Sequence, residues 1–127
     1  LVGSEMCIRD SHILVVEDDP AILRVVVRAL EVEGYAVASA RNGAEALTEV
    51  EADRPRLILL DMHMPVMDGW RFKQALAQRG LEVPIVVMTA AVNAASDASD
   101  IRADGYLGKP FDLDELLGVV ERWHAPS

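Results

Sequence analysis

The amino-acid sequence predicts an α/β fold: a doubly wound, five-stranded parallel sheet built from five consecutive pairs of strand and helix. From His12 onward, short apolar runs alternate with amphipathic stretches at nearly constant spacing, which is typical of repeated βα units. Three of the apolar runs are nearly continuous Val, Ile and Leu, as expected where helices cover both faces of a sheet. Residues 12–124 contain no repeat, low-complexity tract or linker, so we expect one (βα)5 domain.

The apolar runs give the expected strands. Each run is short and is bounded by polar residues, Gly or Pro, which favours a strand over a helix. In chain order the expected strands are Ile13–Val16, Tyr35–Ala40, Leu57–Leu60, Ile85–Met88 and Gly105–Leu107. Parallel strands need crossover connections, and the segments between these runs have helical patterns.

Capping signals mark the starts of three helices. In Pro20–Glu33 the apolar residues fall on one helical face, with Asp19 as the expected N-cap and Gly34 beyond the end. Asn42 and Asp112 each precede a glutamate by three positions, which is the spacing of a capping box. We therefore expect the second and fifth helices to begin at these two residues.

The third and fourth helices have weaker signals. Asp68 and Gly80 bracket an amphipathic stretch that predicts the third helix. Asn93–Ala103 is expected to form the fourth helix, although this segment is polar and has little apolar period.

Composition restricts the classes of function. The chain has 127 residues, 51% hydrophobic and 26% charged, as in an ordinary soluble globular protein. Its formal net charge of −9 argues against direct binding of nucleic acid. The longest apolar stretch, Ile85–Val92, is far shorter than the ~18 residues of a membrane span. Cys7 is the single cysteine, so no internal disulfide can form, and we expect a cytoplasmic location.

The two ends of the chain lie outside the expected domain. Residues 1–11, LVGSEMCIRDS, have neither a strand nor a helix period and lack the features of a signal peptide. We expect them to be a non-native or disordered leader, and residues 125–127 to be a short tail. The expected domain is therefore 12–124.

Acidic residues follow two of the expected strands at the point where each strand ends. Glu17, Asp18 and Asp19 follow the first strand, and Asp61 follows the third. Because the carboxyl ends of neighbouring parallel strands meet at one edge of a sheet, we expect these carboxylates to gather. At ~4 Å each like-charge pair would cost about 4 kcal/mol at an effective dielectric constant of about 20. The cluster therefore needs a cation, and Mg²⁺, which takes oxygen ligands, is the natural candidate.

The fourth and fifth strands are followed by residues that suit a phosphoryl group. Thr89 supplies a hydroxyl, and Lys109 supplies a compact ammonium charge. The charged oxygens of a transferring phosphoryl group need a metal, a fixed cation and hydrogen-bond donors. The sequence offers each of these at a strand end, which predicts phosphoryl chemistry at a carboxylate.

Four segments carry a resemblance to a known family. In order, ILVVEDDP, LILLDMHMPVMDG, VVMTA and GYLGKPF resemble the motifs of a response-regulator receiver domain, and the likeness covers residues 12–124. The resemblance implies a flavodoxin-like sheet with strand order 2-1-3-4-5. It also implies a phosphoaccepting switch of a two-component system, which assists its own phosphorylation and dephosphorylation without being an enzyme in the usual sense.

The resemblance also assigns roles to the acidic residues. Asp61 would accept the phosphoryl group, and Mg²⁺ would be held by Glu17, Asp18, Asp61 and the backbone carbonyl of His63. Asp19 is left to cap the first helix. The imidazole of His63 could in addition tune the rate of dephosphorylation.

Three further residues would respond to the phosphoryl group. Thr89 and Lys109 would contact it, Thr89 would move toward it, and Tyr106 would then turn inward as the aromatic switch residue. The face formed by the fourth helix, fifth strand and fifth helix would change as a result. The resemblance further implies a cis Lys109–Pro110 peptide. Thr89 and Lys109 are 20 positions apart, fewer than in many receivers, so the fourth helix is expected to be short or bent.

The partners implied are proteins rather than nucleic acids or membranes. A sensor histidine kinase or a histidine phosphotransfer protein would donate the phosphoryl group, and a downstream protein or output domain would read the changed face. A homodimer through the fourth helix, fifth strand and fifth helix is a further expectation.

Three other functions were weighed against the receiver. A phosphatase of the haloacid dehalogenase type would need a second Asp two positions after Asp61, where the sequence has His63. A flavodoxin-like cofactor binder would cradle phosphate after the first strand, where Glu17 and Asp18 would repel it. A pseudo-receiver, an interaction module without phosphorylation, remains as the alternative with the same fold.

Overall fold

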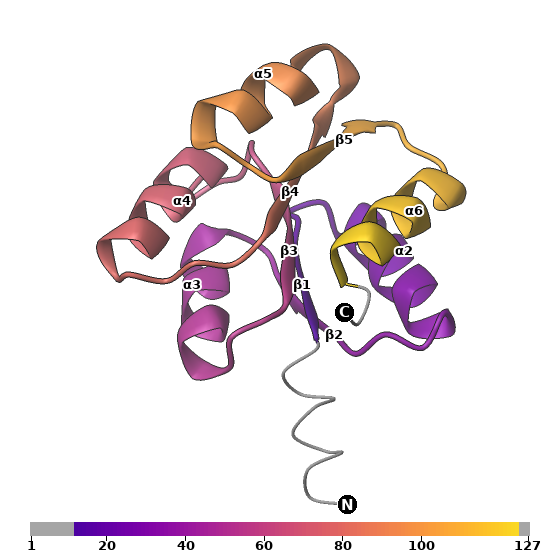
Figure 1. Cartoon of the computed structure of the whole chain (residues 1–127), viewed down its shortest axis with the longest axis horizontal. Helices are drawn as coiled ribbons and strands as arrows, with labels where there is room; N and C mark the ends of the chain where they lie inside the picture. Colours follow the sequence, from indigo (N-terminus) through magenta and orange to yellow (C-terminus); the bar gives the residue numbers. More distant parts are fainter. Residues whose placement is uncertain (1–11, 125–127) are drawn as a thin grey trace, which may run out of the picture.

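The structure, a computed structural model, describes residues 12–124 and contains the expected five-stranded parallel sheet. The strands are β1 (Ile13–Val16), β2 (Val37–Ala40), β3 (Leu57–Asp61), β4 (Ile85–Ala90) and β5 (Gly105–Lys109). Their order across the sheet is β2-β1-β3-β4-β5, and every neighbouring pair is parallel. The predicted fold class and strand order are therefore confirmed (Figure 1). The predicted leader and tail lie outside the described residues.

Helices cover both faces of this sheet. Those in the described part of the chain are α2 (Pro20–Val32), α3 (Gly43–Ala52), α4 (Gly69–Gln78), α5 (Ala91–Ile101) and α6 (Leu113–His124). Helices α2 and α6 lie on one face, and α3, α4 and α5 lie on the other (Figure 1). Within 12–124, no helix combines the length and apolar character needed to cross a bilayer.

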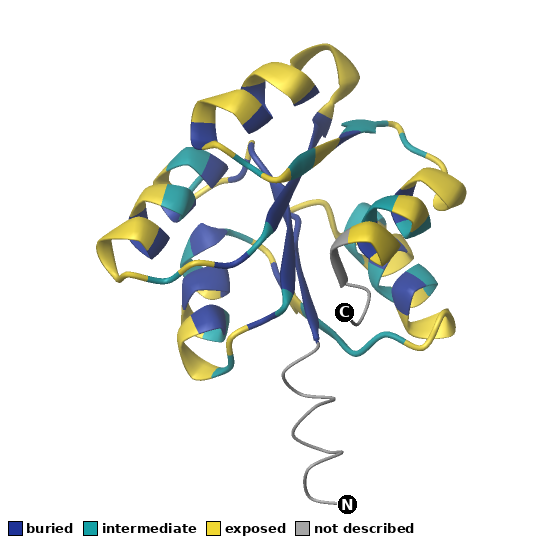
Figure 2. Ribbon diagram, viewed as in Figure 1, coloured by how far each residue is buried: buried dark blue, intermediate teal, exposed yellow. Residues whose placement is uncertain are grey.

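The sheet is the centre of two apolar cores, one under each helical layer. Every residue of Ile13–Val16 and of 57–60 has 0% exposure, so β1 and the body of β3 are shielded on both faces. Figure 2 shows the same pattern, with dark central strands and helices whose outer faces are exposed. Each fully buried aliphatic side chain contributes about 1.5–3 kcal/mol, so the strand ends are held in fixed positions.

The capping predictions are confirmed for the helices that follow β1, β2 and β5. Asp19 Oδ1 accepts a hydrogen bond from the backbone N–H of Ala21, at 2.9 Å. Asn42 caps α3 by accepting from the N–H of Glu45, at 2.9 Å. Asp112 and Glu115 form a reciprocal capping box, in which each side chain accepts from the other's backbone N–H. These caps satisfy N–H groups that the first turn of a helix leaves without partners.

Four strands have bounds that differ from the expected ones. β3, β4 and β5 run further than their apolar sequences, to Asp61, Ala90 and Lys109 respectively. Pairing within the sheet therefore continues into the polar residues, which places Asp61, Thr89 and Lys109 on strands rather than in loops. β2 begins at Val37 instead of Tyr35, because the Tyr35 N–H still donates to Leu30 O at the end of α2.

The fourth helix begins earlier than expected. α5 has 11 residues and begins at Ala91 rather than Asn93, directly after β4. The polar sequence hid this start because Ala90, its N-cap, offers no side-chain cap. A Cβ on Gly108 would lie 2.8 Å from Ala91 Cα, so glycine is what allows β5 to pass so close to the helix start.

Candidate functional site

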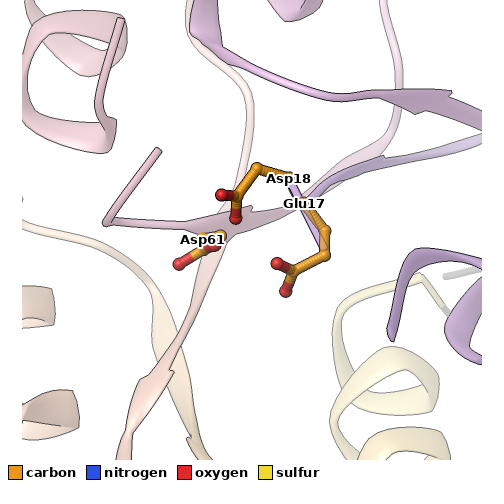
Figure 3. A group of neighbouring side chains, drawn as sticks. All are labelled: Glu17, Asp18 and Asp61. Carbon is orange, nitrogen blue, oxygen red and sulfur yellow. The ribbon is translucent and has the colours of Figure 1, made fainter. Parts of the chain in front are cut away.

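Three carboxylates meet at the carboxyl end of the two central strands (Figure 3). Val16 of β1 is in register with Leu60 of β3, so the residues that follow, Glu17 and Asp61, are neighbours. With Asp18 they offer oxygen atoms that all lie within 4.8 Å of one another. Glu17 and Asp61 are buried, with 1% and 4% exposure, whereas Asp18 is exposed.

Crowding of negative charge changes the protonation of Asp61. Burial, a side-chain hydrogen bond with Glu17 and the charge of Glu17 together raise the pKa of Asp61 to about 8, against the opposing effects of Lys109 and the His63 N–H. A bound cation would oppose this rise in pKa, because it favours the ionised carboxylate. The donor set, three carboxylates within reach of one ion, fits a hard divalent cation such as Mg²⁺.

Lys109 supplies the positive charge of the site from the end of β5. Its Nζ lies 2.5 Å from Glu17 Oε1 and 3.7 Å from Asp61 Oδ2. The Lys109–Pro110 peptide is cis, as expected. The ammonium group thus offsets part of the charge on two buried carboxylates at once.

Thr89 supplies a hydroxyl that lacks a partner. It lies on β4, next to β3, and is 2% exposed. Its Oγ1 is one of two buried side-chain oxygens in the described residues that make no hydrogen bond. Leaving such a group unsatisfied costs about 1–3 kcal/mol, so the hydroxyl is suited to a ligand that brings hydrogen-bonding oxygens.

These side chains line one polar pocket of about 310 Å³. Glu17, Asp18, Asp61, Thr89 and Lys109, all predicted from strand ends, are among its lining residues. A larger apolar groove of about 510 Å³ adjoins it, between α2 and the segment that follows β5. The two hollows share lining residues, so a molecule seated in the groove would reach the mouth of the polar pocket.

The remaining predicted site residues occupy different positions. The His63 N–H donates to Asp61 Oδ1 at 3.1 Å, and the residue also lines the polar pocket. Tyr106 lies apart from that pocket, on β5, where it is 53% exposed and lines a hollow against α6. The Asp19 side chain caps α2, while its N–H donates to Glu17 Oε2 at 3.1 Å.

Sequence reasoning missed Asp97, a buried carboxylate on α5 that lies 3.5 Å from the His63 imidazole. The signal was present but faint. Ala94, Asp97, Ala98 and Ile101 follow the i, i+3, i+4, i+7 spacing of a buried helix face, so the aspartate occupies an apolar position.

Fold and site together define an α/β protein of the doubly wound class with an acidic pocket at the carboxyl edge of its sheet. A family model described as "Response regulator receiver domain" matches residues 13–121. The chain belongs to the response regulator receiver family. It is accordingly a phosphoacceptor signalling domain of two-component systems rather than a classical enzyme.

Individual relatives agree with this assignment. Response regulator MprA of Mycobacterium avium is 43% identical over 108 residues, a match that covers 84% of this chain and 47% of that protein. The chain thus spans about half the length of the curated relatives it matches. The receiver domain of NtrX from Brucella abortus superposes with a TM-score of 0.81 and 31% identity, over 91% of this chain and 99% of that one. TrrA from Thermotoga maritima, solved in complex with Mg²⁺-BeF, gives a TM-score of 0.78 and 34% identity, over 88% and 97%.

Proposed function

We propose that this chain accepts a phosphoryl group on Asp61, in a reaction that depends on Mg²⁺, and passes the signal on through the face formed by α5, β5 and α6. One observation carries the proposal: a buried acceptor carboxylate, a second buried and a third exposed carboxylate, an ammonium group and an unpartnered hydroxyl share a single pocket. Each is a group that phosphoryl transfer requires, and the ends of β1, β3, β4 and β5 hold them in position.

The acidic residues have the arrangement that a divalent cation needs. Glu17, Asp18 and Asp61 would hold Mg²⁺ with their side chains, and His63 would add its backbone carbonyl. The solved structure of TrrA carries Mg²⁺-BeF on the same fold, which supports this choice of ion. When bound, Mg²⁺ neutralises negative charge on the carboxylates and the phosphoryl oxygens.

The chain's own residues position the reaction. The His63 N–H holds Asp61 Oδ1, which fixes the plane of the acceptor carboxylate. A carboxylate oxygen of Asp61 would form the new P–O bond while the P–N bond of a phosphohistidine breaks, and the departing imidazole nitrogen takes up a proton. Lys109 and Thr89 would receive the other phosphoryl oxygens, the first by charge and the second by its free O–H.

The donor would be a sensor histidine kinase or a histidine phosphotransfer protein in the cytoplasm. The apolar groove beside the pocket supports a protein donor, because it extends the polar site with residues of α2 and with Pro110 and Phe111. A helix with an apolar face could lie there and bring its phosphohistidine to Asp61.

The output would be a change in the face made by α5, β5 and α6. Thr89 would move toward the phosphoryl group, and Tyr106, now 53% exposed, would turn inward. A two-state equilibrium biased by one local modification accounts for such a switch. A downstream protein, an output domain or a second copy of this chain would read the changed face.

Mass spectrometry after incubation with acetyl phosphate and Mg²⁺ tests the proposal. We expect one added phosphoryl group on the wild type and none on Asp61→Asn or in the presence of a chelator. Asp100→Asn, an exposed change on α5, is the matched control and should label like the wild type. Failure of the wild type to label would favour the pseudo-receiver instead.

A further inference from the structure

Asp97 is a buried charge outside the site that the proposed function uses. It lies on the inner face of α5 with Ala94, Ala98 and Ile101, and it is 7% exposed. Its Oδ2 makes no hydrogen bond with any other described residue. A buried carboxylate is costly unless a donor faces it, so a donor that approaches this oxygen would help to hold α5 in place.

His63 is the group that approaches it. The Nε2 atom of His63 lies 3.5 Å from Asp97 Oδ2, at the outer limit of a hydrogen bond. The imidazole edge also contacts Trp70 on α4, with ring centroids 5.3 Å apart and planes at 68°. The His63 side chain is therefore held between α4 and α5, although it is 60% exposed.

The same residue is bound to the candidate phosphoacceptor through its backbone. Its N–H donates to Asp61 Oδ1 at 3.1 Å, and it lines the polar pocket. Occupation of the Asp61 oxygens would therefore disturb the hydrogen bond that holds the His63 backbone. A shift of that backbone would also change the distance between the imidazole and Asp97.

We propose that His63 and Asp97 form a latch between the β3–α4 loop and α5, which stabilises α5 in its resting position and is released when the site at Asp61 is occupied. The inference rests on the proposed function and adds a second connection to α5, separate from Thr89 and Tyr106. Tyr106 is 53% exposed in the same structure, which is the position that the proposed function gives it before phosphorylation, so we assign the contact to the resting state. Asp97 is a positioning residue that acts through His63, and the neutral imidazole suffices as donor.

Calorimetry of beryllofluoride binding, with saturating Mg²⁺, measures the coupling between the His63–Asp97 contact and the site at Asp61. A latch that favours the resting state lowers ligand affinity, so Asp97→Ala should bind beryllofluoride about fivefold more tightly than the wild type, within the usual range of allosteric coupling. His63→Ala keeps the backbone N–H and should show a similar gain. The double variant should bind no more tightly than either single variant, because both remove one contact. Asp100→Ala, an exposed aspartate on the same helix, should leave affinity unchanged.

Hydrogen exchange distinguishes the proposed latch from a purely structural role of Asp97. Beryllofluoride should change the exchange of α5 amides in the wild type, and Asp97→Ala should show most of that change before ligand is added. Equal or weaker affinity in Asp97→Ala, or additive effects in the double variant, would overturn the latch while leaving phosphorylation intact. Absence of any beryllofluoride binding to the wild type would instead overturn the proposed function.

Discussion

Asp61 and Asp97 are both buried carboxylates, with 4% and 7% exposure, but their surroundings are opposite. Burial and the neighbouring Glu17 raise the pKa of Asp61 to about 8, although Lys109 at 3.7 Å and the His63 N–H oppose that rise. Among the described residues, the His63 imidazole is the ionisable group that pairs with Asp97. Under the proposals above, the crowded negative charge makes Asp61 sensitive to a bound cation, whereas Asp97 is sensitive to the position of its single partner.

Removing the ammonium group of Lys109 should cause the largest loss of stability. Lys109→Met keeps the aliphatic stem but leaves the buried Glu17 without its partner, so we expect a loss of about 3 kcal/mol in unfolding free energy without metal. Mg²⁺ should recover part of that loss, because the ion replaces the missing positive charge. Urea unfolding with chelator and with Mg²⁺ measures both values. Lys73→Met, on α4 and outside the pocket, is the control, and an equal loss there would contradict the account.

Titration of Asp61 should give the next largest change in stability. The pKa of Asp61 is about 8 in the folded protein and near 3.8 when unfolded, so the folded state binds more protons between these values. Stability is therefore full below pH 4 for this group and is lost as pH rises toward 8, by about 2 kcal/mol between pH 6 and pH 8 without metal. Thermal unfolding at several pH values should show this decline in the wild type.

Asp61→Asn should flatten that decline, since the amide does not titrate. Asp100→Asn is the matched control, and it should retain the wild-type slope because the residue is exposed. Saturating Mg²⁺ should also flatten the wild-type profile by favouring the ionised carboxylate. A slope that is the same in Asp61→Asn and the wild type would place its origin elsewhere.

Changes at the contact between His63 and Asp97 should affect stability less, and the loss should be larger for the His63 variant than for the Asp97 variant. His63→Phe retains a ring against Trp70 but leaves a buried carboxylate without a donor, at a cost of about 1–2 kcal/mol. Asp97→Ala removes the buried charge and leaves His63 in solvent, so its effect should stay within about 0.5 kcal/mol. Chemical denaturation of the two variants and the double variant checks this. A double variant whose loss equals the sum of the two single losses would show that the imidazole does not stabilise Asp97.

The fold could be predicted from the sequence because its determinants are local and periodic. Apolar runs such as Leu57–Leu60 gave the strands, and polar residues such as Asp19 and Asp112 gave the helix starts. Residues at strand ends could also be predicted to meet, because parallel strands align their carboxyl ends. Glu17, Asp61, Thr89 and Lys109 were found in this way.

What could not be predicted depends on contacts between distant segments. α5 begins at Ala91 without a side-chain cap, close to Gly108 of β5, and no pattern within residues 91–101 encodes that approach. The burial of Asp97 requires knowing which side of α5 faces the β3–α4 loop. The pKa of Asp61 likewise depends on the distances to Glu17 and Lys109, which only the folded chain defines.

The junction between β4 and α5 has a mechanical consequence. β4 ends at Ala90 and α5 begins at Ala91, with no intervening loop residue. Thr89 therefore lies two positions before the first residue of α5, and no flexible loop separates the two. If the proposed movement of Thr89 shifts its backbone, α5 should move with it as a rigid body, and the displacement should be largest at the far end of the helix.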